Sequence, residues 1–171
     1  MIERVDVPPV PGADIQISLI LSMLDDGTNE WREELGAVSE ETVIWQPFPG
    51  GHSIGAIILH IADVEAYWLH QIGAGQTRSE EELTRLLSKE TQQYDLSWPL
   101  PPTQPLSRFL AQHDAIRART RQIVATWDDP ALVRPRGDAE FTRRWLLHHV
   151  LTHEAYHGGQ AVLLSVLHGR Q

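Results

Sequence analysis

The feature that most constrains this chain is a histidine-bearing segment near its C-terminal end, residues 142–169. The segment holds five of the nine histidines, contains no proline and is rich in leucine, valine and alanine. A threonine begins it and a glycine ends it, which suits the two ends of a helix. At about 100° per residue, His149, His153 and His157 fall on neighbouring lines of one apolar helix face. We therefore predict one long helix that presents histidines to a core.

The spacing of these histidines predicts a metal site. Two histidines at i and i+4 can bind one ion, whereas three successive ones span about 12 Å along the helix axis. We select the pair His153 and His157, and a third ligand must come from elsewhere. The pair also matches the His-Glu-x-x-His pattern of zinc peptidases. However, positions 160 and 163 hold Gln and Leu, and no carboxylate follows His157, so we do not expect a peptidase.

One upstream histidine has the surroundings expected of the third ligand. His60 lies within a predicted helix over 54–71, at the edge of an apolar stripe. A core-facing imidazole needs a polar partner, which a metal ion supplies. We predict that His60, His153 and His157 bind one divalent ion and that water completes its shell, as in reactive zinc sites. The alternative, in which these histidines merely pack in a metal-free bundle, stays open.

The other histidines are expected to stay outside this site. His149 lies two turns from His157, too far to share the same ion. Four others lie in a glycine-rich loop (His52), at a helix end (His70), in a polar part of a helix (His113) and about three turns beyond the pair (His168). We predict that His52 and His70 lie at the surface.

The apolar periodicity of the chain predicts an all-α fold. Amphipathic segments indicate helices over residues 14–36, 53–72, 105–127 and 142–168, with a shorter polar helix over 79–94 and no sheet. The loop over 45–51 has aromatic residues that either line a pocket or fix the loop to the core. Residues 128–138 are predicted to be a Pro/Gly loop. We expect one domain, 1–171, forming a four-helix bundle, and the long connection between its second and third helices permits a crossover.

Composition excludes several classes of protein. A formal net charge of −9 without a basic stripe argues against nucleic-acid binding. No apolar run approaches a membrane span, and the first residues lack the basic and apolar regions of a signal peptide. The absence of cysteine excludes disulfides and a cysteine nucleophile, so any thiol must arrive with a cosubstrate. We expect a cytoplasmic protein without membrane or nucleic-acid partners.

Two motifs resemble those of a known family, the DinB/YfiT-like metal-binding four-helix bundles, over nearly the whole chain. They are Trp45-Gln46-Pro47, Gly50-Gly51-His52-Ser53-Ile54-Gly55, His60-Ile61 and Glu65 in the first half, and His149-Val150-Leu151-Thr152-His153-Glu154-Ala155-Tyr156-His157-Gly158-Gly159-Gln160 in the second. The resemblance implies a bundle with a long second-to-third crossover, a divalent metal on His60, His153 and His157, and a homodimer. Gly158 stands where members often have arginine.

The resemblance also implies a class of function. Relatives include thiol-dependent S-transferases, a thiol-dependent isomerase and metal-dependent hydrolases. A divalent ion with three neutral ligands keeps most of its charge and can activate a water or a low-molecular-weight thiol. We therefore expect a metal-dependent S-transferase or hydrolase acting on a small molecule, with zinc or nickel as the metal. The alternative is a non-catalytic stress protein that binds a metal or small ligand.

Several residues near the predicted ligands have two interpretations each. Glu154 is the candidate catalytic residue, and Asp63 is a second candidate for proton transfer or ligand support; both are equally compatible with solvated carboxylates on helix faces. Gln160, one turn beyond His157, is a candidate contact of the site. Gly158 and Gly159 are predicted to let a neighbouring helix approach closely.

Overall fold

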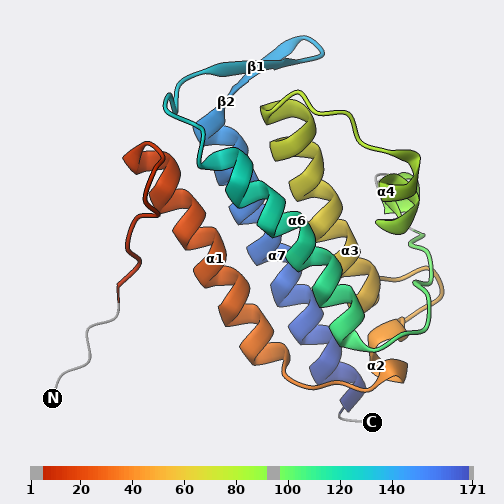
Figure 1. Cartoon of the computed structure of the whole chain (residues 1–171). Helices are drawn as coiled ribbons and strands as arrows, with labels where there is room; N and C mark the ends of the chain where they lie inside the picture. Colours follow the sequence, from red (N-terminus) through yellow and green to blue (C-terminus); the bar gives the residue numbers. More distant parts are fainter. Residues whose placement is uncertain (1–5, 92–96, 170–171) are drawn as a thin grey trace, which may run out of the picture.

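The computed structural model describes residues 6–91 and 97–169, which form a four-helix bundle with a β-hairpin at one end (Figure 1). Its elements are α1 (Ile15–Leu35), α2 (Glu40–Ile44), α3 (Ile54–Glu65), η1 (Ala66–Gly73), α4 (Glu80–Arg85), α5 (Ser88–Thr91), α6 (Leu106–Val124), β1 (Val133–Arg136), β2 (Ala139–Thr142) and α7 (Arg143–Gly169). The predicted all-α bundle is confirmed, and its four main helices lie where the sequence placed them.

The order of the helices includes the predicted crossover. α1 runs away from the hairpin end, whereas α3 and α6 both run towards it and α7 runs back (Figure 1). α3 and α6 are therefore parallel neighbours, and the chain between them returns along the outside of the bundle through α4 and α5. α7 packs against both α1 and α3, so residues on two of its faces are buried.

Local signals in the sequence explain where these helices begin and end. The Asp14 side chain accepts hydrogen bonds from the first turn of α1, and the Ser53 hydroxyl accepts one from the first turn of α3. Gly36 ends α1 with φ of +61°, a conformation that glycine adopts at little cost. The second main helix continues from α3 into η1, a π-helical segment that sequence periodicity did not indicate.

The prediction that the fold contains no sheet is wrong, because β1, within the expected loop, and β2, directly after it, form an antiparallel hairpin. The two strands pair from Val133 opposite Thr142 to Arg136 opposite Ala139, and Gly137 turns with φ of +58°. Proline is disfavoured in central strands but tolerated at sheet edges, and a two-stranded sheet has only edges. Pro135 therefore misled the prediction.

The predicted helix over 79–94 is also different in the structure. Two short helices, α4 and α5, replace it, and Leu87 between them has φ of +52°. The end of the predicted range lies outside the described residues. Among the described residues, no helix combines the length and apolar character that crossing a membrane requires.

Candidate metal centre

The three predicted ligands come together between α3 and α7. His60 projects from α3, and His153 and His157 project from successive turns of α7. The Nε2 atoms of His60 and His153 lie 3.1 Å apart, and each of the three rings lies 4.4–4.9 Å from the other two. One nitrogen from each ring falls within 4.8 Å of the others, so one ion can reach all three.

The hydrogen bonds around the three rings fit a metal site. The Nδ1 atom of His157 contacts the Gln160 side-chain oxygen at 2.8 Å, which keeps the proton on Nδ1 and leaves Nε2 available as a ligand. The Nδ1 atoms of His60 and His153 are buried without a hydrogen-bond partner, while their Nε2 atoms face each other. Two neutral imidazoles directed at one point, with no acid between them, form a donor set suited to a divalent ion.

Burial keeps these rings neutral. It lowers the pKa of His60 to about 3, of His153 to about 2 and of His157 to about 4. Repulsion between neighbouring rings adds to the effect of burial at His60 and His153, while Gln160 partly opposes it at His157. Because only the neutral ring binds a metal, the three side chains are ready as ligands at pH 7.

The three histidines lie in the wall of a cavity of about 870 Å³. Its lining combines the ligands with mostly aromatic and polar residues from α3, η1, α5, β1, α7 and the loops near residues 50 and 98. The lining residues are Phe48, Gly50, Gly51, His52, His60, Asp63, Val64, Tyr67, Trp68, Thr91, Trp98, Arg136, His149, His153, Tyr156 and His157. The volume is in the range of small-molecule sites. The open cavity distinguishes this centre from a closed structural metal site.

The neighbouring histidines and Asp63 line the cavity without joining the ligand group. His149 stacks on Trp145, with ring centroids 4.8 Å apart, and it is not part of the three-residue donor group. His52 was expected at the surface but is half-buried against Trp98, at 3.8 Å between centroids. Asp63 is not a solvated carboxylate: it is 1% exposed and pairs with Arg78 at 2.5 Å.

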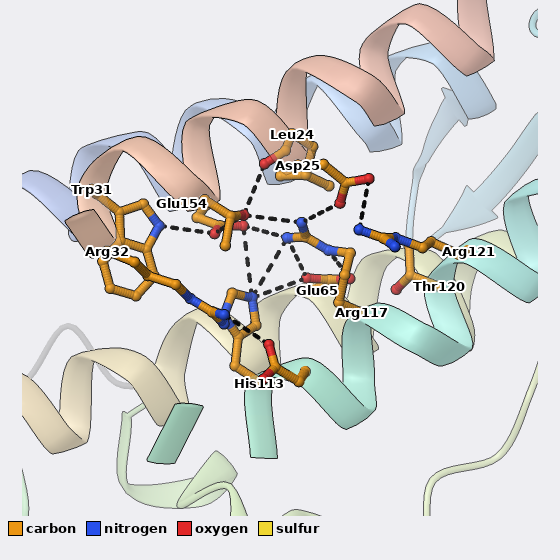
Figure 2. Close-up of polar contacts among 12 residues, drawn as sticks. Leu24, Asp25, Trp31, Arg32, Glu65, His113, Arg117, Thr120, Arg121 and Glu154 are labelled. Carbon is orange, nitrogen blue, oxygen red and sulfur yellow. Dashed lines mark hydrogen bonds and ion pairs between the residues drawn. The ribbon is translucent and has the colours of Figure 1, made fainter. Parts of the chain in front are cut away.

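Glu154 lies in a buried cluster with Glu65, His113 and Arg117 (Figure 2), separate from the donor group of His60, His153 and His157. The interpretation of Glu154 as a solvated carboxylate is wrong, since it is 2% exposed. Its oxygens contact Thr28 at 2.5 Å, Trp31 Nε1 at 3.0 Å and Arg117 Nη2 at 2.5 Å, and it does not line the cavity. The adjacent ligand His153 points to α3, so a one-residue step, about 100°, turns Glu154 towards α1 and α6. The expected catalytic position of Glu154 beside the metal therefore has no support in its contacts.

The glycines after His157 behave differently from each other. A Cβ atom on Gly158 would lie 2.6 Å from Trp31 Cγ, so the predicted close approach of a neighbouring helix is confirmed there. A Cβ on Gly159 would meet nothing within 4 Å, so the prediction is wrong for that residue. His70 was also misplaced by the sequence: it is fully buried, and its Nε2 lies 2.9 Å from the Thr120 hydroxyl.

Several lining residues were missed by the sequence analysis because they come from irregular segments. Trp98 stands at the start of a proline-rich stretch, and Arg136 lies on the unpredicted hairpin. The aromatic loop before α3 supplied the only signal, and both of its interpretations hold in part. Phe48 lines the cavity, whereas Trp45 packs on the core beside His168.

The three-histidine group of this DinB-like bundle is compatible with a divalent metal ion. Residues 19–165 match the family model described as mycothiol-S-transferase, and the chain belongs to that family. A comparison with curated proteins finds no match.

Proposed function

We propose that this protein is a metal-dependent thiol S-transferase whose thiol substrate is mycothiol or a close analogue. The observation that carries the proposal is the His60, His153 and His157 group, which opens into a cavity large enough for a small molecule. The family membership supports a transferase over the non-catalytic metal-binding alternative, and the open cavity supports it independently. A hydrolase that uses the same ligands is the competing reaction, and the match to a transferase family favours the transferase over it.

The three imidazoles are the proposed ligands of the ion. When bound, a divalent cation held by three neutral rings would retain most of its charge and lower the pKa of a thiol in the cavity towards neutrality. Gln160 holds the His157 ring through Nδ1 and so directs its Nε2 towards the other two ligands. Zinc and nickel both suit imidazole donors, and both remain within the proposal.

The cavity wall orients two substrates for transfer. His52 and Trp98 form one side, near His157, and Tyr67 and Trp68 form the side towards the hairpin. In the proposed reaction, the thiol sulfur forms a bond to an electrophilic carbon, the leaving group departs with its bonding electrons, and the thiol proton passes to solvent. Aromatic side chains exclude water from the reacting atoms and offer faces for the carbon skeletons of both substrates.

We also propose a homodimer formed through α7. Its outward face has apolar side chains at Tyr156, Leu163, Val166 and Leu167 that are 37–65% exposed. These residues follow a helical spacing on one side of the helix, so they form one stripe. Because Tyr156 also lines the cavity, pairing through this stripe would narrow the cavity mouth. Light scattering at micromolar concentration should give twice the mass of the 19.3 kDa chain, and Leu163→Glu should give the monomer mass.

Conjugation of mycothiol to a fluorogenic alkyl halide tests the enzymatic proposal. Metal-loaded wild type should transfer the thiol, chelation should abolish the transfer, and zinc or nickel should restore it. His157→Ala should be inactive even with added metal, whereas His148→Ala, on the exposed side of α7, should keep wild-type activity. Equal activity of the chelated and the reloaded protein would contradict the proposal.

A further inference from the structure

A second cleft, separate from the histidine cavity, lies at the hairpin end of the bundle and has a volume of about 520 Å³. Its walls come from the ends of η1 and α6, the start of α7 and strand β1. They comprise Gly73, Ala74, Gln76, Arg119, Gln122, Ile123, Thr126, Trp127, Arg134 and Arg143. No residue is shared with the lining of the histidine cavity.

The charge of this cleft contrasts with that of the chain. Three arginines line it, and among the described residues no aspartate or glutamate does so, although the formal net charge of the protein is −9. Uncharged hydrogen-bonding side chains, Gln76, Gln122 and Thr126, complete its polar lining. The cleft therefore concentrates positive charge on an acidic protein.

Arg143 is the most buried of the three arginines. It is 9% exposed, its guanidinium lies 5.1 Å from the centre of the Trp127 ring, and its Nε is buried without a hydrogen-bond partner. Its ion pair is with Asp128 Oδ1 at 3.6 Å, and the Asp128 side chain is 95% exposed. A buried charge is normally paired and hydrogen-bonded, so this weak, solvated contact leaves a deficit.

The other two arginines have N–H groups that their contacts with the described residues do not use. Arg134 donates from Nε to the Gly73 carbonyl at 2.9 Å, and the described residues give it no ion pair. Arg119 contacts Gln76 and pairs with Glu82 at 3.3 Å. Burial lowers the pKa of Arg143, the charge of Arg134 lowers it further, and Asp128 and Asp129 only partly oppose this. The two neighbouring guanidinium groups therefore repel each other across the cleft.

Binding of backbone carbonyls at helix ends is the alternative explanation for arginines in this place. It accounts for the Nε of Arg134, which bonds the last residue of η1. It does not account for the partnerless Nε of Arg143 or for the lack of any acid in the lining. We propose that the cleft binds an oxyanion of the phosphate class, as inorganic phosphate or a phosphate ester, between Arg119, Arg134 and Arg143.

A tetrahedral dianion suits this group because guanidinium forks donate in pairs to phosphate oxygens. Once bound, it would connect β1, α6 and α7, which supply the three arginines. The anion would thus add contacts at the hairpin end and stabilise the folded state by mass action.

Titration calorimetry with inorganic phosphate, at constant ionic strength set by sodium chloride, tests the site. We expect saturable one-to-one binding to wild type and a higher melting temperature in phosphate than in chloride. Arg134→Gln, which leaves the more buried Arg143 in place, should weaken binding at least tenfold. Arg108→Gln removes an exposed arginine outside the cleft and should bind like wild type. His153→Ala should also bind phosphate, which excludes the histidine cavity as the source of the signal.

The remaining outcomes distinguish between classes of ligand. Glycerol phosphate binding at least as tightly as phosphate would assign the site to an ester, and tighter binding of phosphate would assign it to the free ion; both support the proposal. Succinate binding more tightly than either would overturn the phosphate class. Unchanged phosphate binding by both Arg134→Gln and Arg119→Gln, or loss of binding in His153→Ala, would overturn the cleft itself, whatever the outcome of the transferase assay.

Discussion

Two polar clusters lie on different faces of α7, and only one of them contains a cationic side chain. His153 and His157 face α3, where they meet His60, and the Nε2 atoms of His60 and His153 lie 3.1 Å apart. Glu154 faces the interior between α1 and α6, where its oxygens meet Arg117, Thr28 and Trp31 (Figure 2). The first cluster lines a cavity, and the second is closed within the bundle.

The closed cluster shows what a satisfied set of buried charges looks like. Arg117 donates to both oxygens of Glu65, at 2.9 and 3.0 Å, and also to Asp25 and Glu154. Burial raises the pKa of Glu65, but the charge of Arg117 outweighs this and holds the pKa well below its usual range. Glu65, His113 and Glu154 have atoms close enough for a metal, yet Arg117 already supplies the positive charge there. Proximity of ligand types alone therefore does not define a metal site; the absence of a competing cation does.

The largest expected effect comes from breaking the closed cluster. Arg117→Met would leave Glu65 and Glu154 buried without their counter-charge, which should lower the free energy of unfolding by about 3–5 kcal/mol. Arg121→Met, one turn later and with a side chain 57% exposed, should cost less than about 1 kcal/mol. Urea unfolding measures both. Similar losses from the two variants would contradict the role of Arg117 as the centre of this cluster.

The next largest effect on stability concerns His70, a buried histidine with a hydrogen-bond partner. It contrasts with His60 and His153, whose Nδ1 atoms have none. Burial lowers the pKa of His70 to about 4, from 6.5 in the unfolded chain. Between pH 4 and pH 6.5 the unfolded chain binds a proton at His70 that the folded chain does not bind. The contribution of the neutral His70 ring to the free energy of unfolding is therefore complete above pH 6.5 and is lost as the pH falls towards 4. The difference corresponds to about 3 kcal/mol. Unfolding free energies of wild type and His70→Gln should therefore converge as the pH falls from 7 to 4, and a constant difference would contradict this.

A smaller effect, on metal affinity, should come from removing the Gln160 side chain that contacts His157. Gln160→Ala removes the oxygen that accepts from His157 Nδ1, so metal affinity should fall by about 10–100-fold while the three ligands remain. Competition with a chromophoric chelator measures the affinity. Gln122→Ala, outside the histidine cavity, is the control and should bind metal like wild type. Unchanged affinity in Gln160→Ala would show that His157 is oriented by packing alone.

The smallest effect tests the packing of α7 on α1, beside the Glu154 cluster. Gly158→Ala would press a methyl group against Trp31, whose indole also donates to Glu154, and should cost about 1–3 kcal/mol. Gly159→Ala meets open space and should stabilise the helix by up to about 1 kcal/mol. Thermal melting of the pair should therefore shift in opposite directions. Equal shifts would contradict the close approach.

The comparison also shows which parts of the molecule the sequence could predict. Periodicity and capping residues such as Asp14 and Ser53 gave the main helices, and the i, i+4 spacing with the apolar setting of His60 selected the ligand trio. These signals are local or belong to one helix face. The contacts of Glu154 depend on residues 37 and 126 positions away, Arg117 and Thr28, so no local pattern reveals them.

The burial of His70 and the hairpin escaped prediction for related reasons. His70 depends on Thr120 of α6, a residue 50 positions away that only the crossover brings near. The hairpin depends on a two-residue turn at Gly137 that outweighs the proline in β1. In each case a tertiary contact or turn geometry decided the outcome over local propensity.

Metal content of the purified, untagged protein tests the central claim most directly. Elemental analysis should find about one divalent ion per chain in wild type and in His149→Ala. The single variants His60→Ala, His153→Ala and His157→Ala should contain almost none and should melt at lower temperature, because metal binding contributes to folding. Full metal content in His60→Ala or His153→Ala, or its loss in His149→Ala, would contradict the assignment of this site.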